Sequence, residues 1–263
     1  MRRSPGARRG RGPSDREDHL IGVLVSGEGT NLQALIDDGL PISAVASNKP
    51  GVPALERAQS AGIRTAVFEL DRYESREERD EAMADWLAGQ GVRLVVCAGY
   101  MHLLRPSFLE RFGGRIVNTH SAPLPDFPGA HPIEDVLAAG AKETAATVHY
   151  VDEGVDTGPV IAAEPVPVRE DDTVQTLRER VQAVEHRLLP KAVRELISSS
   201  VSWGAAGGAG PEGTVLPSTG PESTVLPAAS GGGGAAEAGE RSRESNPRSL
   251  GPAGADAGQE GEA

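Results

Sequence analysis

Short apolar runs alternate with amphipathic segments through the middle of the chain. The apolar runs are bounded by turn residues and predict strands at residues 20–26, 42–47, 64–68, 93–98 and 116–120. The segments between them repeat apolar residues at helical spacing and predict helices after Asn31 and at residues 54–61, 75–87, 106–112, 133–139 and 173–197. Two further extended runs, 145–151 and 159–168, adjoin without a helix between them.

This order predicts an α/β fold. Strands that alternate with helices pair in parallel, whereas strands that adjoin along the chain usually pair antiparallel. We therefore expect a mainly parallel sheet with antiparallel strands near its C-terminal end and helices on both faces. Residues 145–151 alternate between polar and apolar, so this strand is expected to be half polar, and Ser75 with Glu78 resembles a capping box.

The two ends of the chain lack this pattern. Residues 1–18 hold six Arg and three acidic residues, and residues 201–263 are dominated by Gly, Ala, Pro, Ser and Glu. Segments with so few apolar residues cannot bury a core. We therefore expect one domain at residues 19–200, a disordered basic tail at 1–18 and a disordered, acidic, Gly/Ala/Pro/Glu-rich tail at 201–263.

The formal charge is unevenly divided. Of the net −12, the first tail contributes +3, the second −5 and the domain −10, which argues against non-specific binding of nucleic acid.

No apolar run reaches the roughly 18 residues of a membrane-spanning helix. The lone Cys97 lies in an apolar run and is expected in the core, so no disulfide can form within the chain. The N-terminus lacks the apolar region of a secretory signal, which makes the cytoplasm the default location.

Candidate chemistry gathers where the strand at residues 116–120 ends. Prolines follow at positions 123, 125, 128 and 132, so the strand must give way to an extended loop. Asn118 and His120 are two residues apart, and period-two geometry points both side chains to the same face. Ligands of open α/β sheets bind beyond the carboxyl ends of the strands, where this amide donor and titratable base would therefore lie together.

A glycine turn follows the first predicted strand, with the sequence Gly27-Glu28-Gly29-Thr30-Asn31. Glycines let the backbone approach a ligand closely, and the free amides at the start of the next helix favour an anion such as phosphate. The third glycine of dinucleotide-binding turns and the Gly-Lys-Ser/Thr of a P-loop are both missing. Alone, the pattern is equally consistent with a tight turn that Thr or Asn caps.

Six motifs, taken in order, resemble those of one family. They are SGEGTN (26–31), SRE (75–77), AGYM (98–101), NTH followed by LPDFPGAH (within 118–131), TVHYVDEGVDTGPVI (147–161) and RVQAVEHRLLP (180–190). Across residues 19–200 the chain resembles the small, monofunctional phosphoribosylglycinamide formyltransferases. The resemblance implies a Rossmann-like formyltransferase fold.

The same resemblance implies a reaction of purine biosynthesis. The amine of glycinamide ribonucleotide would attack the formyl carbon of the co-substrate 10-formyltetrahydrofolate and pass through a tetrahedral oxyanion. Asn118 and a protonated His120 could donate hydrogen bonds to that oxyanion, and Asp156 would favour the protonated histidine. The proton lost by the amine would reach the leaving folate nitrogen through His120 or a water held by Asp156. No metal is expected, because the histidines are scattered without cysteine partners.

Binding residues follow from their positions in the motifs. The ribonucleotide is expected to contact Gly29, Thr30, Asn31, Gln182 and Glu185. The folate site is expected to be lined by Arg76, Met101, His102, Leu103, Leu104, Asn118, Asp152, Glu153, Gly154 and Val155. Thr147 and His149, on the neighbouring strand, are expected to support His120.

Two positions depart from the family pattern. The family usually has Pro directly after the catalytic His, where this chain has Ser121, and here a proline stands two positions later, at Pro123. The family also often has Arg at the position of His102, so the affinity or pH dependence of folate binding is expected to differ. Neither change removes a catalytic group.

Other functions compete with this one. Methionyl-tRNA formyltransferase and formyltetrahydrofolate deformylase share the core, but the first normally adds a C-terminal β-rich domain and the second an N-terminal regulatory domain. A folate-binding protein without turnover and a flavin or nicotinamide binder each fit part of the pattern, but intact Asn118, His120 and Asp156 argue against the first and the missing third glycine against the second. Taken alone, His120 could be a structural strand-end residue and Asp156 could cap its own turn. We favour an enzyme with small-molecule substrates, monomeric or homodimeric, that binds neither nucleic acid nor membrane.

Overall fold

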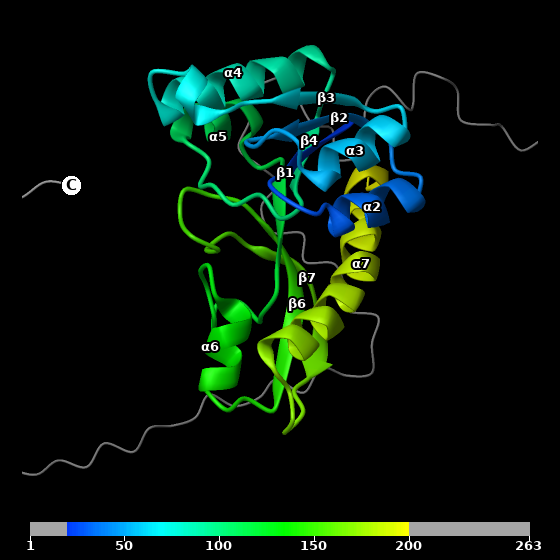
Figure 1. Ribbon diagram of the computed structural model, residues 1–263, viewed down its shortest axis with the longest axis vertical. Coiled ribbons are helices and arrows are strands. Elements are labelled where there is room, and N and C mark those ends of the chain that lie inside the picture. The colour runs from blue at the N-terminus through cyan, green and yellow to red at the C-terminus, as the bar shows by residue number, and fades with distance from the viewer. Residues whose placement is uncertain (1–19, 200–263) are drawn as a thin grey trace, which may run out of the picture. The chain divides into compact units, whose positions relative to one another are not determined.

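The computed structural model describes residues 20–199, which form a seven-stranded sheet in the order β3-β2-β1-β4-β5-β6-β7 (Figure 1). The strands are β1 (Ile21–Val25), β2 (Ile42–Ser47), β3 (Arg64–Val67), β4 (Leu94–Cys97), β5 (Ile116–His120), β6 (Glu143–Tyr150) and β7 (Val160–Pro167). β1 to β5 pair in parallel, whereas β6 pairs antiparallel with both β5 and β7. The predicted α/β class, with antiparallel strands at the C-terminal end, is confirmed. The tails predicted at 1–18 and 201–263 lie outside the described residues.

Helices alternate with the parallel strands. They are α2 (Thr30–Asp37), α3 (Pro53–Ser60), the 3₁₀ helix η1 (Leu70–Arg72), α4 (Arg76–Gly89), α5 (Pro106–Phe112), α6 (Pro132–Ala138) and α7 (Val174–Ser198). η1 was not predicted, because so short a helix shows no periodicity. The capping box at α4 is half formed: Ser75 accepts a hydrogen bond from the Glu78 N–H, but the Glu78 carboxylate accepts from the Glu74 N–H.

Two hydrophobic clusters cover the two faces of the sheet. Neighbouring residues of β1 divide between them, since Val23 belongs to one cluster and Leu24 to the other, as the period of two requires. On one face α2, α3 and α7 pack against the sheet, and Leu189 of α7 is fully buried there. On the other face α4 and α5 contribute residues such as Met83 and Phe108. In Figure 1, β1 to β3 accordingly lie between α4 above and α2 and α3 below.

β6 is half polar, as its sequence predicted. The polar side chains alternate as expected, but Thr147 is 1% exposed and His149 is 2% exposed. The polar face of β6 is therefore directed into the protein, where β5 and the turn that follows β6 meet it. A buried polar face needs hydrogen-bond partners, and these partners define the candidate site.

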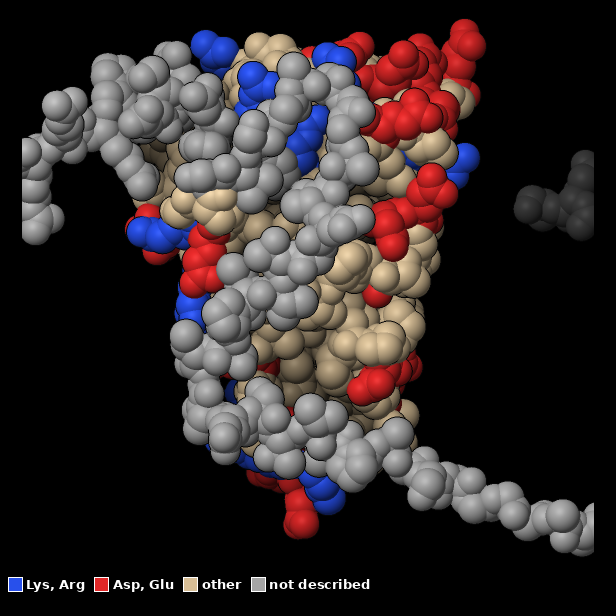
Figure 2. All heavy atoms as spheres, turned by 180° about the vertical axis from the view of Figure 1, so that it is seen from behind, with Lys and Arg blue, Asp and Glu red and all other residues tan. Residues whose placement is uncertain are grey.

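The surface of the described residues is rich in acid. Figure 2 shows Asp and Glu side chains gathered along one edge of the face that it presents, in keeping with the net negative charge of this part of the chain. Within residues 20–199, no helix has the length and apolar character required to cross a membrane.

Candidate active site

Asn118 and His120 lie at the carboxyl end of β5, beside polar residues of β6. In the antiparallel register, Asn118 is opposite His149 and His120 is opposite Thr147. The amide nitrogen of Asn118 is 3.2 Å from Nε2 of His149. The Thr147 hydroxyl donates to the carbonyl oxygen of Ala122 at 2.8 Å, so it holds the loop that follows His120. The strand pairing therefore brings one amide and two imidazoles together.

Asp156 lies between the two histidines. Its Oδ2 is 3.4 Å from His120 Nδ1, and its Oδ1 is 3.5 Å from His149 Nε2. The Gly129 N–H donates to Oδ2 at 2.9 Å. Within residues 20–199, Asp156 is the only residue other than glycine with a positive φ, 54°. Such a conformation costs on the order of 1 kcal/mol and is common at functional sites, where the surroundings enforce it.

The alternative that Asp156 only caps its own turn does not fit these contacts. The capping residue is Asp152, whose Oδ1 accepts hydrogen bonds from the Gly154 N–H at 3.0 Å and from the Thr157 hydroxyl at 2.6 Å. Asp152 thus satisfies the polar groups inside the turn. The Asp156 carboxylate is left to face the imidazoles.

Backbone carbonyls determine which ring nitrogens carry protons. His120 Nε2 is 2.6 Å from the carbonyl oxygen of Phe127, and His149 Nδ1 is 2.8 Å from that of Tyr150. Because a carbonyl oxygen only accepts, these two ring nitrogens are the donors. His149 Nε2 accepts from the Asn118 amide when the ring is neutral, and donates to Asp156 Oδ1 when the ring carries a second proton. A second proton on His120, at Nδ1, would lie between the ring and Asp156.

The charge of Asp156 depends on these neighbours. Burial alone would raise the pKa of its carboxyl. Hydrogen bonds from His149 and the Gly129 N–H, together with positive charge on His120 and His149, outweigh burial and hold the pKa of Asp156 below its usual value. Asp156 is therefore an anion near neutral pH and can stabilise a positive charge on either imidazole.

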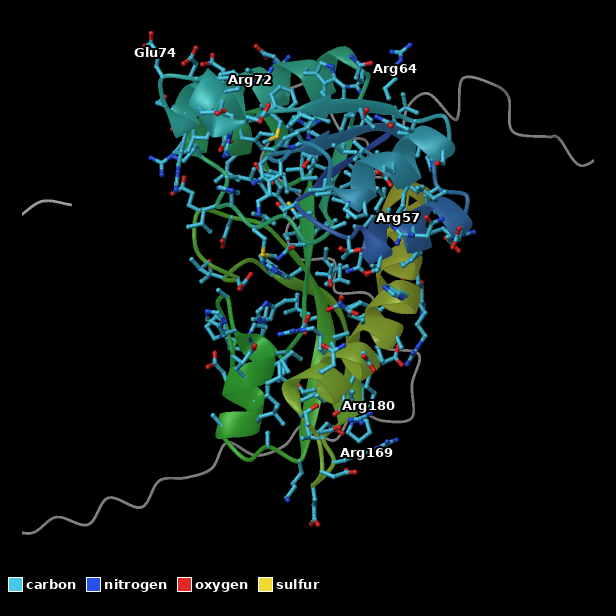
Figure 3. All side chains as sticks on the ribbon, in the orientation of Figure 1. Arg57, Arg64, Arg72, Glu74, Arg169 and Arg180 are labelled. Carbon is cyan, nitrogen blue, oxygen red and sulfur yellow. The ribbon has the colours of Figure 1, made fainter. Side chains whose placement is uncertain are left out.

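The glycine turn leads from β1 into α2. Gly29 has φ 71° and directly precedes Thr30, the first residue of α2. A Cβ on Gly29 would lie 2.6 Å from Cβ of Ala54, so α3 packs directly against the turn. Arg57 of α3 extends toward the start of α2 (Figure 3), and its Nε donates to the carbonyl oxygen of Glu28 at 2.8 Å. The turn is thus held so that the first amides of α2 are available to an anion.

α7 brings Glu185 to this turn. The Glu185 carboxylate accepts hydrogen bonds from the Asn31 amide at 2.9 Å and from the Ser121 hydroxyl at 2.6 Å. Gln182 lies three residues earlier on the same helix and therefore on the same face. Two residues predicted to bind the ribonucleotide, Asn31 and Glu185, are in direct contact, and Ser121 is joined to them.

The segment after β4 is fixed at both ends. The Met101 N–H donates to the Ser26 hydroxyl oxygen at 3.0 Å. The Arg105 N–H donates to Asp80 at 2.8 Å, and Asp80 forms an ion pair with Arg79 at 2.6 Å in which neither side chain is exposed. These anchors were not predicted from the sequence, although Ser26 stands in the SGEGTN motif.

The side chains predicted to line the folate site are largely exposed. Met101, Leu103 and Val155 expose 73%, 62% and 46% of their surface, which is unusual for large apolar side chains. His102 lies between Met101 and Leu103 in the sequence. Burial, followed by the charges of Arg79 and Arg76, lowers the pKa of His102, so its ring is neutral at pH 7.

One recess has none of the residues Asn118, His120, His149 and Asp156 in its lining. It has a volume of about 440 Å³, and its lining consists of Gln33, Pro53, Glu56, Arg57, Ser60 and Ala61. None of these lining residues is an imidazole or belongs to the strand end, so we place the candidate site at the strand end instead. Among residues 20–199, no cluster of three or more His, Cys, Asp or Glu side chains is arranged to hold a metal ion.

Comparison with known proteins identifies the family. A family model described as formyl transferase matches residues 20–193. The chain belongs to the formyl transferase family. The resemblance drawn from the motifs is thereby confirmed at the level of the family, and the Rossmann-like formyltransferase fold is confirmed with it.

Individual formyl transferase relatives span the same region. The chain is 44% identical to the phosphoribosylglycinamide formyltransferase of Mycobacterium tuberculosis over 187 residues, which are 68% of this chain and 86% of that protein. The crystal structure of glycinamide ribonucleotide transformylase 1 from Symbiobacterium toebii matches with 42% identity and a TM-score of 0.68, over 70% of this chain and 89% of that one.

Longer relatives contain the same region as one part. The chain is 44% identical to the trifunctional purine biosynthetic protein adenosine-3 of Gallus gallus over 193 residues, which are 71% of this chain. It spans only 19% of the length of that protein, and between 14% and 20% of the other trifunctional relatives.

Proposed function

We propose that this formyl transferase transfers the formyl group of 10-formyltetrahydrofolate to the amine of glycinamide ribonucleotide. The observation that carries the proposal is the cluster of Asn118, His120, His149 and Asp156 at the carboxyl end of β5. It combines an amide donor, a proton carrier and a carboxylate in a buried place, which formyl transfer requires. The names of the relatives from Mycobacterium tuberculosis and Symbiobacterium toebii support the same acceptor.

The chemical step assigns a role to each group. The amine forms a bond to the formyl carbon, whose oxygen becomes an oxyanion, and Asn118 donates a hydrogen bond to it. Protonated His120 donates a second one when its Nε2–H turns from the Phe127 carbonyl oxygen to the oxyanion. One such donor contributes about 10²–10³-fold to the rate. Asp156 stabilises the imidazolium of His120. When the bond from the formyl carbon to the folate nitrogen breaks, the proton released by the amine passes to that nitrogen through His120 or a water held by Asp156.

Both substrates have proposed places. We assign the ribonucleotide phosphate to the turn at Gly29, Thr30 and Asn31, with Gln182 and Glu185 contacting the same molecule. The anion-binding character of the first turn of α2 supports this assignment. We assign 10-formyltetrahydrofolate to the exposed apolar residues Met101, Leu103 and Val155 and their neighbours, which are Arg76, His102, Leu104, Asn118, Asp152, Glu153 and Gly154. The cytoplasmic location and the monomeric or homodimeric state stay predictions.

The proposal is tested by turnover of the two named substrates. We expect wild-type protein to transfer formyl from 10-formyltetrahydrofolate to glycinamide ribonucleotide, and His120→Ala to lower kcat by about 10²–10⁴-fold. Asp156→Asn is expected to lower kcat by about 10²-fold, because the imidazolium loses its counter-charge. The control is His131→Ala, since His131 is exposed before α6 and outside the cluster, and its kcat is expected within about twofold of wild type.

Other results would redirect the assignment. A protein that binds folate but transfers no formyl group would be a binding protein. Release of formate without an acceptor would indicate a deformylase. Transfer to initiator methionyl-tRNA in place of the ribonucleotide would indicate the tRNA formyltransferase activity.

A further inference from the structure

The Glu185 carboxylate is held by hydrogen bonds from two separate elements. Ser121 reaches it from the end of β5 with its hydroxyl 2.6 Å from Oε1, and Asn31 reaches it from α2 with its amide nitrogen 2.9 Å from Oε2. Glu185 itself is 5% exposed. Each carboxylate oxygen therefore has its own donor, and rotation of the carboxylate would break both bonds.

These contacts define which atoms of Ser121, Asn31 and Glu185 donate hydrogen bonds and which accept them. Both partners donate, so the Glu185 carboxylate accepts one hydrogen bond at each oxygen. The Asn31 Oδ1 is buried without a hydrogen-bond partner, because the amide turns its nitrogen toward Glu185. The reverse orientation would place two oxygens against each other. The carboxylate thus sets the orientation of the Asn31 side chain.

Ser121 connects this carboxylate to the catalytic strand end. It directly follows His120, whose ring faces Asp156. The proline that the family resemblance leads us to expect at position 121 has no hydroxyl and could not donate to Glu185. The hydrogen bond is therefore a consequence of the departure at this position.

We propose that Ser121 is a positioning residue for the acceptor substrate, whose hydroxyl holds Glu185 and, through it, Asn31 in the orientation that binds glycinamide ribonucleotide. This inference rests on the proposed function, in which Asn31 and Glu185 contact the ribonucleotide. Because Ser121 acts on acceptor binding and not on the reacting atoms, its loss should raise the KM for the acceptor and leave kcat and the KM for 10-formyltetrahydrofolate nearly unchanged.

The experiment compares full-length wild type with Ser121→Ala and Ser121→Thr. We expect Ser121→Ala to raise the acceptor KM about tenfold, with kcat and the folate KM within about twofold of wild type. Ser121→Thr retains the hydroxyl and is expected to restore the acceptor KM to within about threefold. The matched control is Ser43→Ala, which removes a hydroxyl from β2 that lies 3.5 Å from a backbone carbonyl oxygen, and no KM is expected to change.

A double-mutant cycle tests whether the effect passes through Glu185. In a Glu185→Ala background, adding Ser121→Ala is expected to change the acceptor KM by less than about twofold, because the hydroxyl has no carboxylate left to hold. Isothermal titration with the ribonucleotide and thermal unfolding of each variant separate binding from folding. An acceptor KM within about twofold of wild type in folded Ser121→Ala, or a full effect of Ser121→Ala without Glu185, would overturn the inference while the proposed function stands. Wild type that neither binds nor formylates the ribonucleotide would overturn both.

Discussion

Asp156 combines an unfavourable backbone conformation with a carboxylate that faces two imidazoles. Its positive φ is tolerated by Asp and Asn better than by most residues, and the Gly129 N–H fixes the carboxylate from the opposite loop. The exchange of Asp156 for Asn keeps the shape and the backbone preference but removes the charge. Asp156→Asn therefore isolates what the charge contributes to folding.

The sign of the pH dependence follows from the pKa of Asp156. The folded-state pKa is below the unfolded value of about 3.9, so the stabilisation is complete above that value and is lost as the pH falls through the folded pKa. We expect Asp156→Asn to be about 1–3 kcal/mol less stable than wild type at pH 6 and the difference to shrink below about pH 4. Urea unfolding of both proteins at pH 6, 5 and 3.5 measures this. A difference that grows on acidification would contradict the assignment of Asp156 as the ionised partner.

The contacts of the site show which residues can be recognised in a sequence. Asn118, His120 and Asp156 are chemically distinctive and stand in motifs, so they could be singled out before any fold was known. The partners of His120 and Asp156 could not, because the Phe127 carbonyl and the Gly129 N–H are backbone groups that almost any residue would supply. The contact between Ser121 and Glu185 joins residues far apart in the chain and leaves no local pattern.

At the scale of elements, the predicted strands and helices follow from periodicity and from turn residues. For β6, the alternation predicts one polar and one apolar face, but it does not reveal whether the polar face meets solvent or a second polar element. Thr147 and His149 are buried because the loop and turn around Ala122 and Asp156 supply their partners. An alternating strand can therefore be buried on both faces.

The packing of α3 against the glycine turn allows a prediction at the same scale. Gly29 and Gly39 have nearly equal φ values, 71° and 69°, but a Cβ on Gly29 would meet Ala54 at 2.6 Å whereas a Cβ on Gly39 would meet nothing within 4 Å. We expect Gly39→Ala to cost about 1–2 kcal/mol of unfolding free energy through its backbone alone. Gly29→Ala is expected to cost about 1–3 kcal/mol more, because α3 must move. Urea unfolding of the two variants measures the difference, and equal costs would mean that α3 does not approach the turn as described.

At the scale of the whole molecule, the site lies where the sheet changes from parallel to antiparallel pairing. β5 is the last parallel strand and β6 the first antiparallel one, so polar side chains from both strands meet at this edge. α7 then returns across the sheet and contacts both α2 and β6, which brings Glu185 to the turn after β1. The order of strands and helices along the chain therefore assembles the candidate site from distant parts of the sequence.

The formyl transferase family model matches residues 20–193, and residues 20–199, the part that the structure describes, contain a hydrophobic cluster on each face of the sheet and the candidate site. We therefore expect a protein of residues 19–200 to fold and to retain formyl transfer within about twofold of the full-length chain. Its Tm is expected within about 4 °C of the full-length value, which corresponds to about 1 kcal/mol for a domain of this size. Calorimetry and the formyl-transfer assay on both proteins measure this, with His120→Ala in the shorter protein as the inactive control. A Tm lowered by about 10 °C, or loss of turnover in a folded 19–200 protein, would mean that residues outside this range contribute to the core or to the site.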